Sequence, residues 1–155
     1  MQPKTLCFLI LGDPPTHLLL GRKKTGFGAG KVVGIGGGIE PGETPEAAAI
    51  RELAEETCVG VRPADLHPAG TVDFVFPARP SWSQFVHLYT ATIWQGAPTE
   101  SDEIVPTWAA LDAIPYDQMW PDASHWLPRL LAGEPIHLRF TYAADCRTIA
   151  VVESV

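Results

Sequence analysis

The sequence predicts a mixed α/β domain, and two observations carry the prediction. Apolar segments rich in β-branched and aromatic residues recur along the chain; the clearest are 6–11, 70–76, 85–94 and 136–142. A stretch with helical periodicity, Pro45–Thr57, follows a run of glycines. No internal repeat or low-complexity tract interrupts this pattern. We therefore expect one domain that spans residues 1–155.

The first elements follow from local signals. Strands are expected at Leu6–Leu11 and His17–Leu20, around the turn-prone sequence GDPP. The glycine loop comes next, and then the helix Pro45–Thr57. Thr44 is a suitable N-cap for this helix, since its side chain can accept a hydrogen bond from the first turn.

The second half of the chain alternates strand signals with one more helix. Segments 70–76 and 85–94 flank the turn-prone sequence PARPSWS. A short strand near Val105–Ala109 precedes a helix expected at Ser124–Leu131. Segments 136–142 and 147–153 are expected to close the sheet as a hairpin around AADC.

Composition agrees with a small enzyme of the cytoplasm. A chain of 155 residues that is 46% hydrophobic can bury a core without disulfides. The three cysteines form no CxxC pair, which favours a reducing cytoplasmic setting. The run Leu6–Leu11 is too short to span a membrane, so no membrane contact is expected. A net charge of −7 argues against binding long nucleic acids, and implies that metal ions attract any polyphosphate substrate.

The helix Pro45–Thr57 gathers acids on one face. Relative to Glu52, the side chain of Glu55 lies about 60° to one side and that of Glu56 about 40° to the other. Like charges at this spacing repel by roughly 0.2–0.5 kcal/mol per pair, so a compensating cation is expected. Arg51 can neutralise one carboxylate. Mg²⁺ could neutralise the others, because it prefers oxygen ligands and bridges carboxylates to phosphates.

The spacing around this helix resembles the Nudix box of MutT-like pyrophosphohydrolases. Gly37 is followed after five residues by Glu43, and after seven more by the sequence RELAEET at 51–57. The family then has a glycine, where this chain has Cys58. A left-handed helix end costs a non-glycine residue on the order of 1 kcal/mol, and Gly60 is a candidate to take over the cap. The resemblance implies an α/β/α sandwich with a mixed β-sheet.

The resemblance also implies a site and a reaction. It implies hydrolysis of modified or oxidised purine nucleoside triphosphates, such as 8-oxo-dGTP, to the monophosphate and pyrophosphate, with Mg²⁺ or Mn²⁺ as cofactor. The expected metal ligands are Gly36, Glu52, Glu55, Glu56 and Glu103. The same four glutamates and Arg51 form the expected catalytic set. Glu43 and Arg51 would orient the carboxylates rather than react.

A nucleotide pocket is implied by segments before and after the box, GRKKTGFGAG, ESDEIVPTW and MWPDASHW, which are similar to those of the family's oxidised-purine triphosphatases. The expected substrate-binding residues are Phe8, Lys23, Phe27, Val33, Phe74, Gln84, Trp120 and Asp122. Those relatives read the base with an asparagine and two consecutive aspartates. Aligned on their motifs, this chain has Val33, then Asp122 followed by Ala123. Preference for 8-oxo-dGTP over dGTP is therefore expected to be weaker than the resemblance alone implies.

Two alternatives remain at this level. One is a Nudix hydrolase of another nucleoside diphosphate derivative, such as a nucleotide sugar. The other is a non-catalytic nucleotide sensor, which should lack part of the carboxylate set that is complete here. In each case a nucleotide is the expected partner of a monomeric protein.

Overall fold

The computed structural model describes residues 1–155, which form nine strands and two α-helices. The strands are β1 (Gln2–Leu11), β2 (His17–Lys23), β3 (Val32–Val33), β4 (Ile35–Gly38), β5 (His67–Val75), β6 (Gln84–Ala91), β7 (Ile104–Ala110), β8 (Ile136–Tyr142) and β9 (Ile149–Ser154). The helices are α1 (Pro45–Thr57) and α2 (Ala123–Leu131). Short 3₁₀ turns occupy Pro63–Asp65, Pro80–Trp82 and Tyr116–Gln118. Neither α-helix is long and apolar enough to cross a lipid bilayer.

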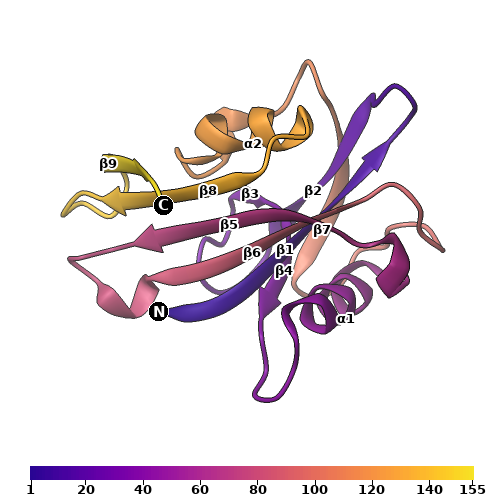
Figure 1. Cartoon of the computed structure of the whole chain (residues 1–155), viewed down its shortest axis with the longest axis horizontal. Helices are drawn as coiled ribbons and strands as arrows, with labels where there is room; N and C mark the ends of the chain where they lie inside the picture. The colour runs from indigo at the N-terminus through magenta and orange to yellow at the C-terminus, as the bar shows by residue number, and fades with distance from the viewer.

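The strands form a mixed sheet in the order β3-β2-β1-β6-β5-β8-β9. Strand β4 also pairs with β1, and β7 with β2. The pairs β1–β6 and β5–β8 are parallel, and the other pairs are antiparallel. Helices α1 and α2 lie on opposite sides of the sheet (Figure 1). The predicted α/β/α sandwich is confirmed.

Two separate cores lie on the two sides of the sheet. Under α2, buried residues include Phe8, Trp126 and Phe140. Between α1 and the sheet, Leu9 and Leu53 belong to a second buried cluster. Because side chains alternate along a strand, consecutive residues of β1 contribute to different cores. Strand β1 is thus the central element, and the site described below lies against it.

The predicted elements are present, with differences at their ends. Strand β1 begins at Gln2 rather than Leu6, and β6 ends at Ala91 rather than Trp94. Strands β3 and β4 were not predicted. Strand β4 has the sequence IGGG, which gives no strand signal, and β3 is only two residues long. In the structure, β4 pairs in antiparallel register with residues 4–7 of β1.

The ends of α1 are set by two different residues. Thr44 is the N-cap, as predicted, and its hydroxyl accepts a hydrogen bond from the Ala47 backbone N–H at 3.1 Å. At the other end Cys58 itself is left-handed, with φ 63°. The expectation that Gly60 takes over the cap was wrong. The Cys58 N–H already bonds the Ala54 carbonyl, and Gly60 forms a β-bridge elsewhere.

The left-handed Cys58 gives a stability prediction. Cys58→Gly should raise the free energy of unfolding by about 0.5–1 kcal/mol, because relief of the left-handed strain exceeds the added flexibility of the unfolded chain. Urea unfolding of the purified variants measures the change. Cys58→Ala keeps the Cβ and is the control, for which no gain is expected. Equal stability of the glycine and alanine variants would contradict a strain at this position.

Candidate active site

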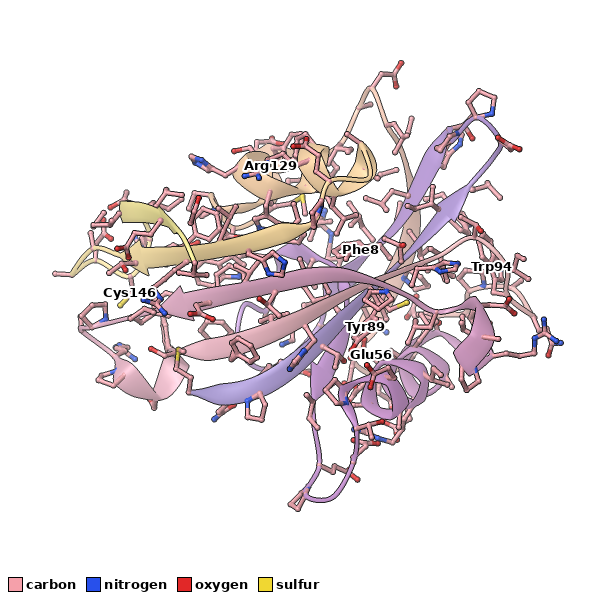
Figure 2. All side chains as sticks on the ribbon, viewed as in Figure 1. Phe8, Glu56, Tyr89, Trp94, Arg129 and Cys146 are labelled. Carbon is pink, nitrogen blue, oxygen red and sulfur yellow. The ribbon has the colours of Figure 1, made fainter.

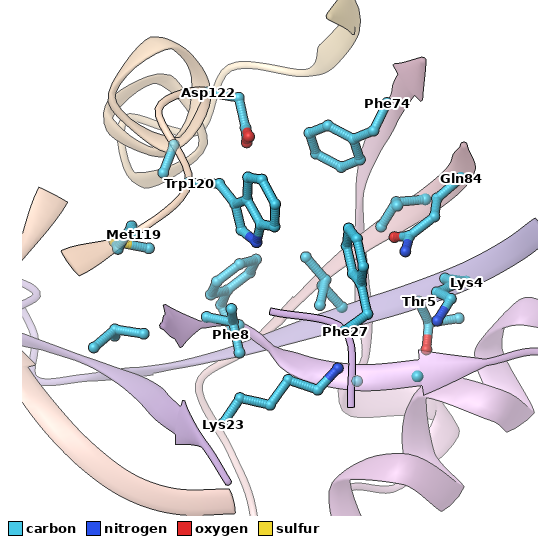
Figure 3. Close-up of a pocket in the computed structure, with 18 of the residues that line it drawn as sticks. Lys4, Thr5, Phe8, Lys23, Phe27, Phe74, Gln84, Met119, Trp120 and Asp122 are labelled. Carbon is cyan, nitrogen blue, oxygen red and sulfur yellow. The ribbon is translucent and has the colours of Figure 1, made fainter. Parts of the chain in front are cut away.

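A pocket opens beside β1 and reaches from the acidic helix to the start of α2 (Figure 3). Its volume is about 150 Å³. The pocket-lining residues include every predicted substrate-binding residue: Phe8, Lys23, Phe27, Val33, Phe74, Gln84, Trp120 and Asp122. Gly36 and Glu56 line the same pocket. The predicted binding residues and the acidic helix therefore border one continuous cavity.

Aromatic rings form one end of the pocket. Phe27 stacks on Trp120, with ring centroids 5.3 Å apart and an interplanar angle of 15°. Since these rings are in direct stacking contact, a purine does not fit between them in this conformation. A base can instead lie beside this stack, toward Phe8 and Phe74, which line the same cavity.

Asp122 is buried at the same end, and its carboxylate is held by two aromatic side chains. The Trp126 indole N–H donates to Oδ2 at 2.9 Å, and the Tyr142 hydroxyl bonds Oδ1. Burial raises the pKa of Asp122, while the hydrogen bonds from Trp126 and Tyr142 act in the opposite direction. Each carboxylate oxygen keeps a free lone pair, so Asp122 can still accept a hydrogen bond from a base.

The two positions that depart from the family pattern lie at the predicted place. Val33 and Ala123 line the pocket with Asp122, and Gln84 lines it from β6. Only Asp122 and Gln84 therefore offer a polar side chain at these four positions. The pocket wall is more apolar here than one built from an asparagine and two aspartates.

Arg51 organises the acidic face of α1. Its Nε and Nη2 atoms donate to the two Glu43 carboxylate oxygens at 2.7 and 2.9 Å, a forked arrangement. Its Nη1 atom donates to Glu52 at 3.0 Å and to the exposed Glu55 at 3.2 Å. A further bond at 2.9 Å to the Gly38 carbonyl ties the helix to the end of β4. Arg51 positions the carboxylates, as expected.

Glu56 differs from its neighbours on α1 because it is buried and forms no ion pair. It is 7% exposed, and its Oε2 atom has no hydrogen-bond partner. Burial, followed by the charges of Glu52 and Glu103, raises the pKa of Glu56 to about 8. Glu56 lies where α1 faces the sheet (Figure 2). Such a buried carboxylate is costly unless a cation or a proton neutralises it.

Glycine makes room for Glu52 on the sheet side. A Cβ on Gly37 would lie 2.5 Å from the Glu52 carboxyl carbon, so any larger residue there would displace this side chain. Burial raises the pKa of Glu52, against the opposing effect of Arg51. The glycines of β4 thus allow the backbone to approach the acids closely, as expected for a loop that borders an ion.

The predicted metal ligands are not assembled as a ready cluster. No three His, Cys, Asp or Glu side chains lie close enough to ligate one ion. Arg51 holds Glu52 and Glu55, while Glu103 is exposed in the turn before β7, where its backbone carbonyl accepts a hydrogen bond from the Lys24 N–H. The orphaned Glu56 oxygen and the Gly37 cradle nevertheless fit a hard divalent cation. Side-chain rotation of Glu52 or Glu103 would complete such a site.

Several residues at the site were missed by sequence reasoning. Tyr142, which bonds Asp122 from β8, lies 20 residues further along the chain, so only the fold brings the two together. Trp126 lies four residues after Asp122, and this helical spacing is a signal in the sequence. Lys4 and Leu6 also line the pocket, and the alternation of side chains along the strand could have predicted this. They alternate with Phe8 along β1 and so share its face.

The Arg51–Glu43 pair gives a prediction about acid stability. The fork lowers the pKa of Glu43 from 4.5 to about 2 in the folded protein. The ionised Glu43 therefore stabilises the folded protein at pH values above its pKa in the unfolded chain, about 4.5. This stabilisation is lost as the pH falls from about 4.5 to 2. Glu43→Gln should flatten the fall in unfolding free energy over this range, measured by urea unfolding at each pH.

An exposed acid serves as the control for that experiment. Glu153 is exposed at the end of β9 and forms no ion pair, so Glu153→Gln should leave the acid slope unchanged. If Glu43→Gln and Glu153→Gln gave the same slope, the fork would not shift the titration of Glu43.

An α/β/α sandwich whose Glu-rich helix borders an aromatic pocket is the architecture of a NUDIX domain. The NUDIX domain family model matches residues 2–130, so the chain belongs to the NUDIX family. The chain is 44% identical over 142 residues to the oxidized purine nucleoside triphosphate hydrolase of Mus musculus, covering 90% of this chain and 89% of that protein.

Two further relatives agree with this assignment. The 8-oxo-dGTP diphosphatase of Escherichia coli (strain K12) is 33% identical over 93 residues, which cover 60% of this chain and 68% of that protein. A crystal structure of the mMutator MutT protein from Bacillus halodurans superposes with a TM-score of 0.80 at 22% identity. The match covers 99% of this chain and 97% of that one. The latter similarity concerns the fold alone.

Proposed function

We propose that this protein is a metal-dependent hydrolase of modified or oxidised purine nucleoside triphosphates, such as 8-oxo-dGTP, which it cleaves to the monophosphate and pyrophosphate. The observation that carries the proposal is the orphaned Glu56 carboxylate, which lines the same pocket as the aromatic base site. The relatives named for triphosphate hydrolysis support the substrate class. The activity would remove damaged nucleotides from the pool.

The acids of α1 would hold Mg²⁺, or Mn²⁺, against the phosphate chain. Glu52, Glu56, Glu103 and the Gly36 carbonyl are the proposed ligands, with Glu55 at the exposed margin. When bound, such an ion stabilises charge on the phosphates and lowers the pKa of a bound water. Arg51 keeps the carboxylates in place through its fork to Glu43. Lys23 faces the pocket and binds the phosphate chain.

The base would lie among the aromatic side chains, with Asp122 and Gln84 as its polar readers. Val33 and Ala123 present methyl groups at two positions where related enzymes have polar residues that hydrogen-bond the base. We infer a single domain over residues 1–155 that acts as a monomer in the cytoplasm. The three cysteines are free, as is usual in a reducing compartment.

A hydrolase of another nucleoside diphosphate derivative, such as a nucleotide sugar, is the second candidate. It shares the acidic helix, and the apolar wall at Val33 and Ala123 favours it, because that wall lacks two of the polar groups that read an oxidised purine. A nucleotide sensor without activity is disfavoured, since Glu52, Glu55, Glu56 and Glu103 are all present.

A substrate panel tests the proposal. The wild-type protein is incubated with 8-oxo-dGTP, dGTP, dATP, ADP-ribose and a nucleotide sugar, with Mg²⁺ or with EDTA, and released phosphate and pyrophosphate are measured. We expect pyrophosphate from purine triphosphates in Mg²⁺ and none in EDTA. Faster cleavage of ADP-ribose or the nucleotide sugar would favour the second candidate. Nucleotide binding without any turnover would indicate the sensor.

A further inference from the structure

A second lysine, Lys4, lies on the pocket wall and forms no ion pair with an acidic side chain. It belongs to β1, where its register partners are Gly38 on β4 and Val86 on β6. Side-chain alternation puts Lys4, Leu6 and Phe8 on one face, and all three line the pocket. Phe8 is buried, whereas Lys4 is partly exposed at the outer end of this row. The row thus leads from the base site toward solvent.

Lys4 and Lys23 enter the same pocket from different strands (Figure 3). Neither side chain forms an ion pair, although the adjacent Lys24 pairs with Glu100, and Glu52 and Glu55 of α1 pair with Arg51. Burial lowers the pKa of Lys4, and the nearby charge of Lys23 lowers it further, whereas Glu52 raises it. The two neighbouring ammonium groups repel each other, and a polyanionic ligand would relieve this repulsion.

The position of Lys4 indicates which part of a nucleotide it reaches. Four residues of strand separate it from Phe8, about 13 Å. A nucleotide whose base rests near Phe8 would therefore extend its phosphate chain along the pocket that Lys23 and Glu56 also line. Lys4, about 13 Å along β1, lies at the distance of the outer phosphates.

We propose that Lys4 binds the terminal phosphate of the substrate and makes the site select triphosphates over monophosphates and capped diphosphates. The proposal rests on the proposed function, because it takes the phosphate chain to run along β1. Lys23 holds the inner part of the chain, and Lys4 recognises the charge that only a free terminal phosphate carries. Lys4 is thus a specificity-determining residue rather than a participant in bond cleavage.

Steady-state kinetics with Mg²⁺ tests this role. For Lys4→Met, the KM for 8-oxo-dGTP should rise about tenfold, as expected for one charged hydrogen bond, while kcat stays within about threefold. The inhibition constant of 8-oxo-dGMP should not change, because that product lacks the terminal phosphate. Lys4→Arg should restore most of the affinity. Added KCl should raise the KM of the wild-type protein more steeply than that of Lys4→Met.

The control is Arg147→Gln, which removes the same charge from an exposed turn outside the pocket. Its kinetics should equal those of the wild type. The proposal is overturned if Lys4→Met lowers kcat at constant KM, or if the inhibition constant of 8-oxo-dGMP rises in parallel with the KM. Failure of the proposed function would look different, since the wild-type protein itself would then not hydrolyse 8-oxo-dGTP.

Discussion

Replacing Glu56 by glutamine should lower turnover at least about a hundredfold, because electrostatic stabilisation of a phosphoryl transition state is worth roughly 3 kcal/mol or more. Glu56 is the buried acid of α1, and its Oε2 atom has no partner within the protein. The amide keeps the shape of the side chain but removes the charge that would hold a cation. Turnover of 8-oxo-dGTP at saturating Mg²⁺ is the measurement.

The fold should survive this substitution, and far-UV circular dichroism and urea unfolding would verify it. Burial raises the pKa of Glu56 to about 8, so folding of the metal-free protein at neutral pH requires this carboxyl to take up a proton, which lowers stability. The neutral amide should therefore be at least as stable. Glu55→Gln is the matched control, because Glu55 lies on the same face but is 59% exposed. Glu55→Gln should lower turnover much less than Glu56→Gln does. Equal turnover of Glu56→Gln and wild type would refute the assignment.

Val33→Asn combined with Ala123→Asp should raise the preference for 8-oxo-dGTP over dGTP by about ten- to a hundredfold. Each added polar reader contributes roughly 0.5–1.5 kcal/mol if it bonds one base better than the other, and 1.4 kcal/mol is about tenfold. Both positions line the pocket beside Asp122. Ala123 is the first residue of α2, where the helix dipole tolerates a negative charge.

The ratio of kcat/KM for the two nucleotides, measured in the wild type and in the double variant, tests this. Because Ala123 is 3% exposed, an aspartate there is harder to accommodate than an asparagine at the partly exposed position 33. The single variant Val33→Asn therefore accompanies the double one and should give part of the gain. A strong 8-oxo preference in the wild type, unchanged by either substitution, would show that other residues read the base.

The fold could be predicted where local signals are strong. The helix α1 was placed at Pro45–Thr57 with its N-cap, since Thr44, Pro45 and the apolar period all agree. The pocket residues could be predicted because the resemblance fixes their order along the chain. Strand β4 could not, since the glycines that let Glu52 approach the sheet are poor strand formers, and β3 is only two residues long.

The details that were missed depend on contacts between distant segments. The stack of Phe27 on Trp120 and the bond from Tyr142 to Asp122 each join residues that no local pattern relates, whereas Trp126 lies only four residues after Asp122. The helix end was missed for another reason. Sequence propensity favours glycine in a left-handed cap, but Cys58 adopts that conformation, and Gly60 instead forms a β-bridge to Gln95.

The most direct test of metal-dependent cleavage inside the phosphate chain is ³¹P NMR of 8-oxo-dGTP hydrolysis in H₂¹⁸O. With Mg²⁺, we predict that the products are 8-oxo-dGMP and pyrophosphate, that the ¹⁸O label lies in one of these two, and that EDTA stops the reaction. Release of orthophosphate with 8-oxo-dGDP, or label incorporation at an equal rate in EDTA, would contradict the account.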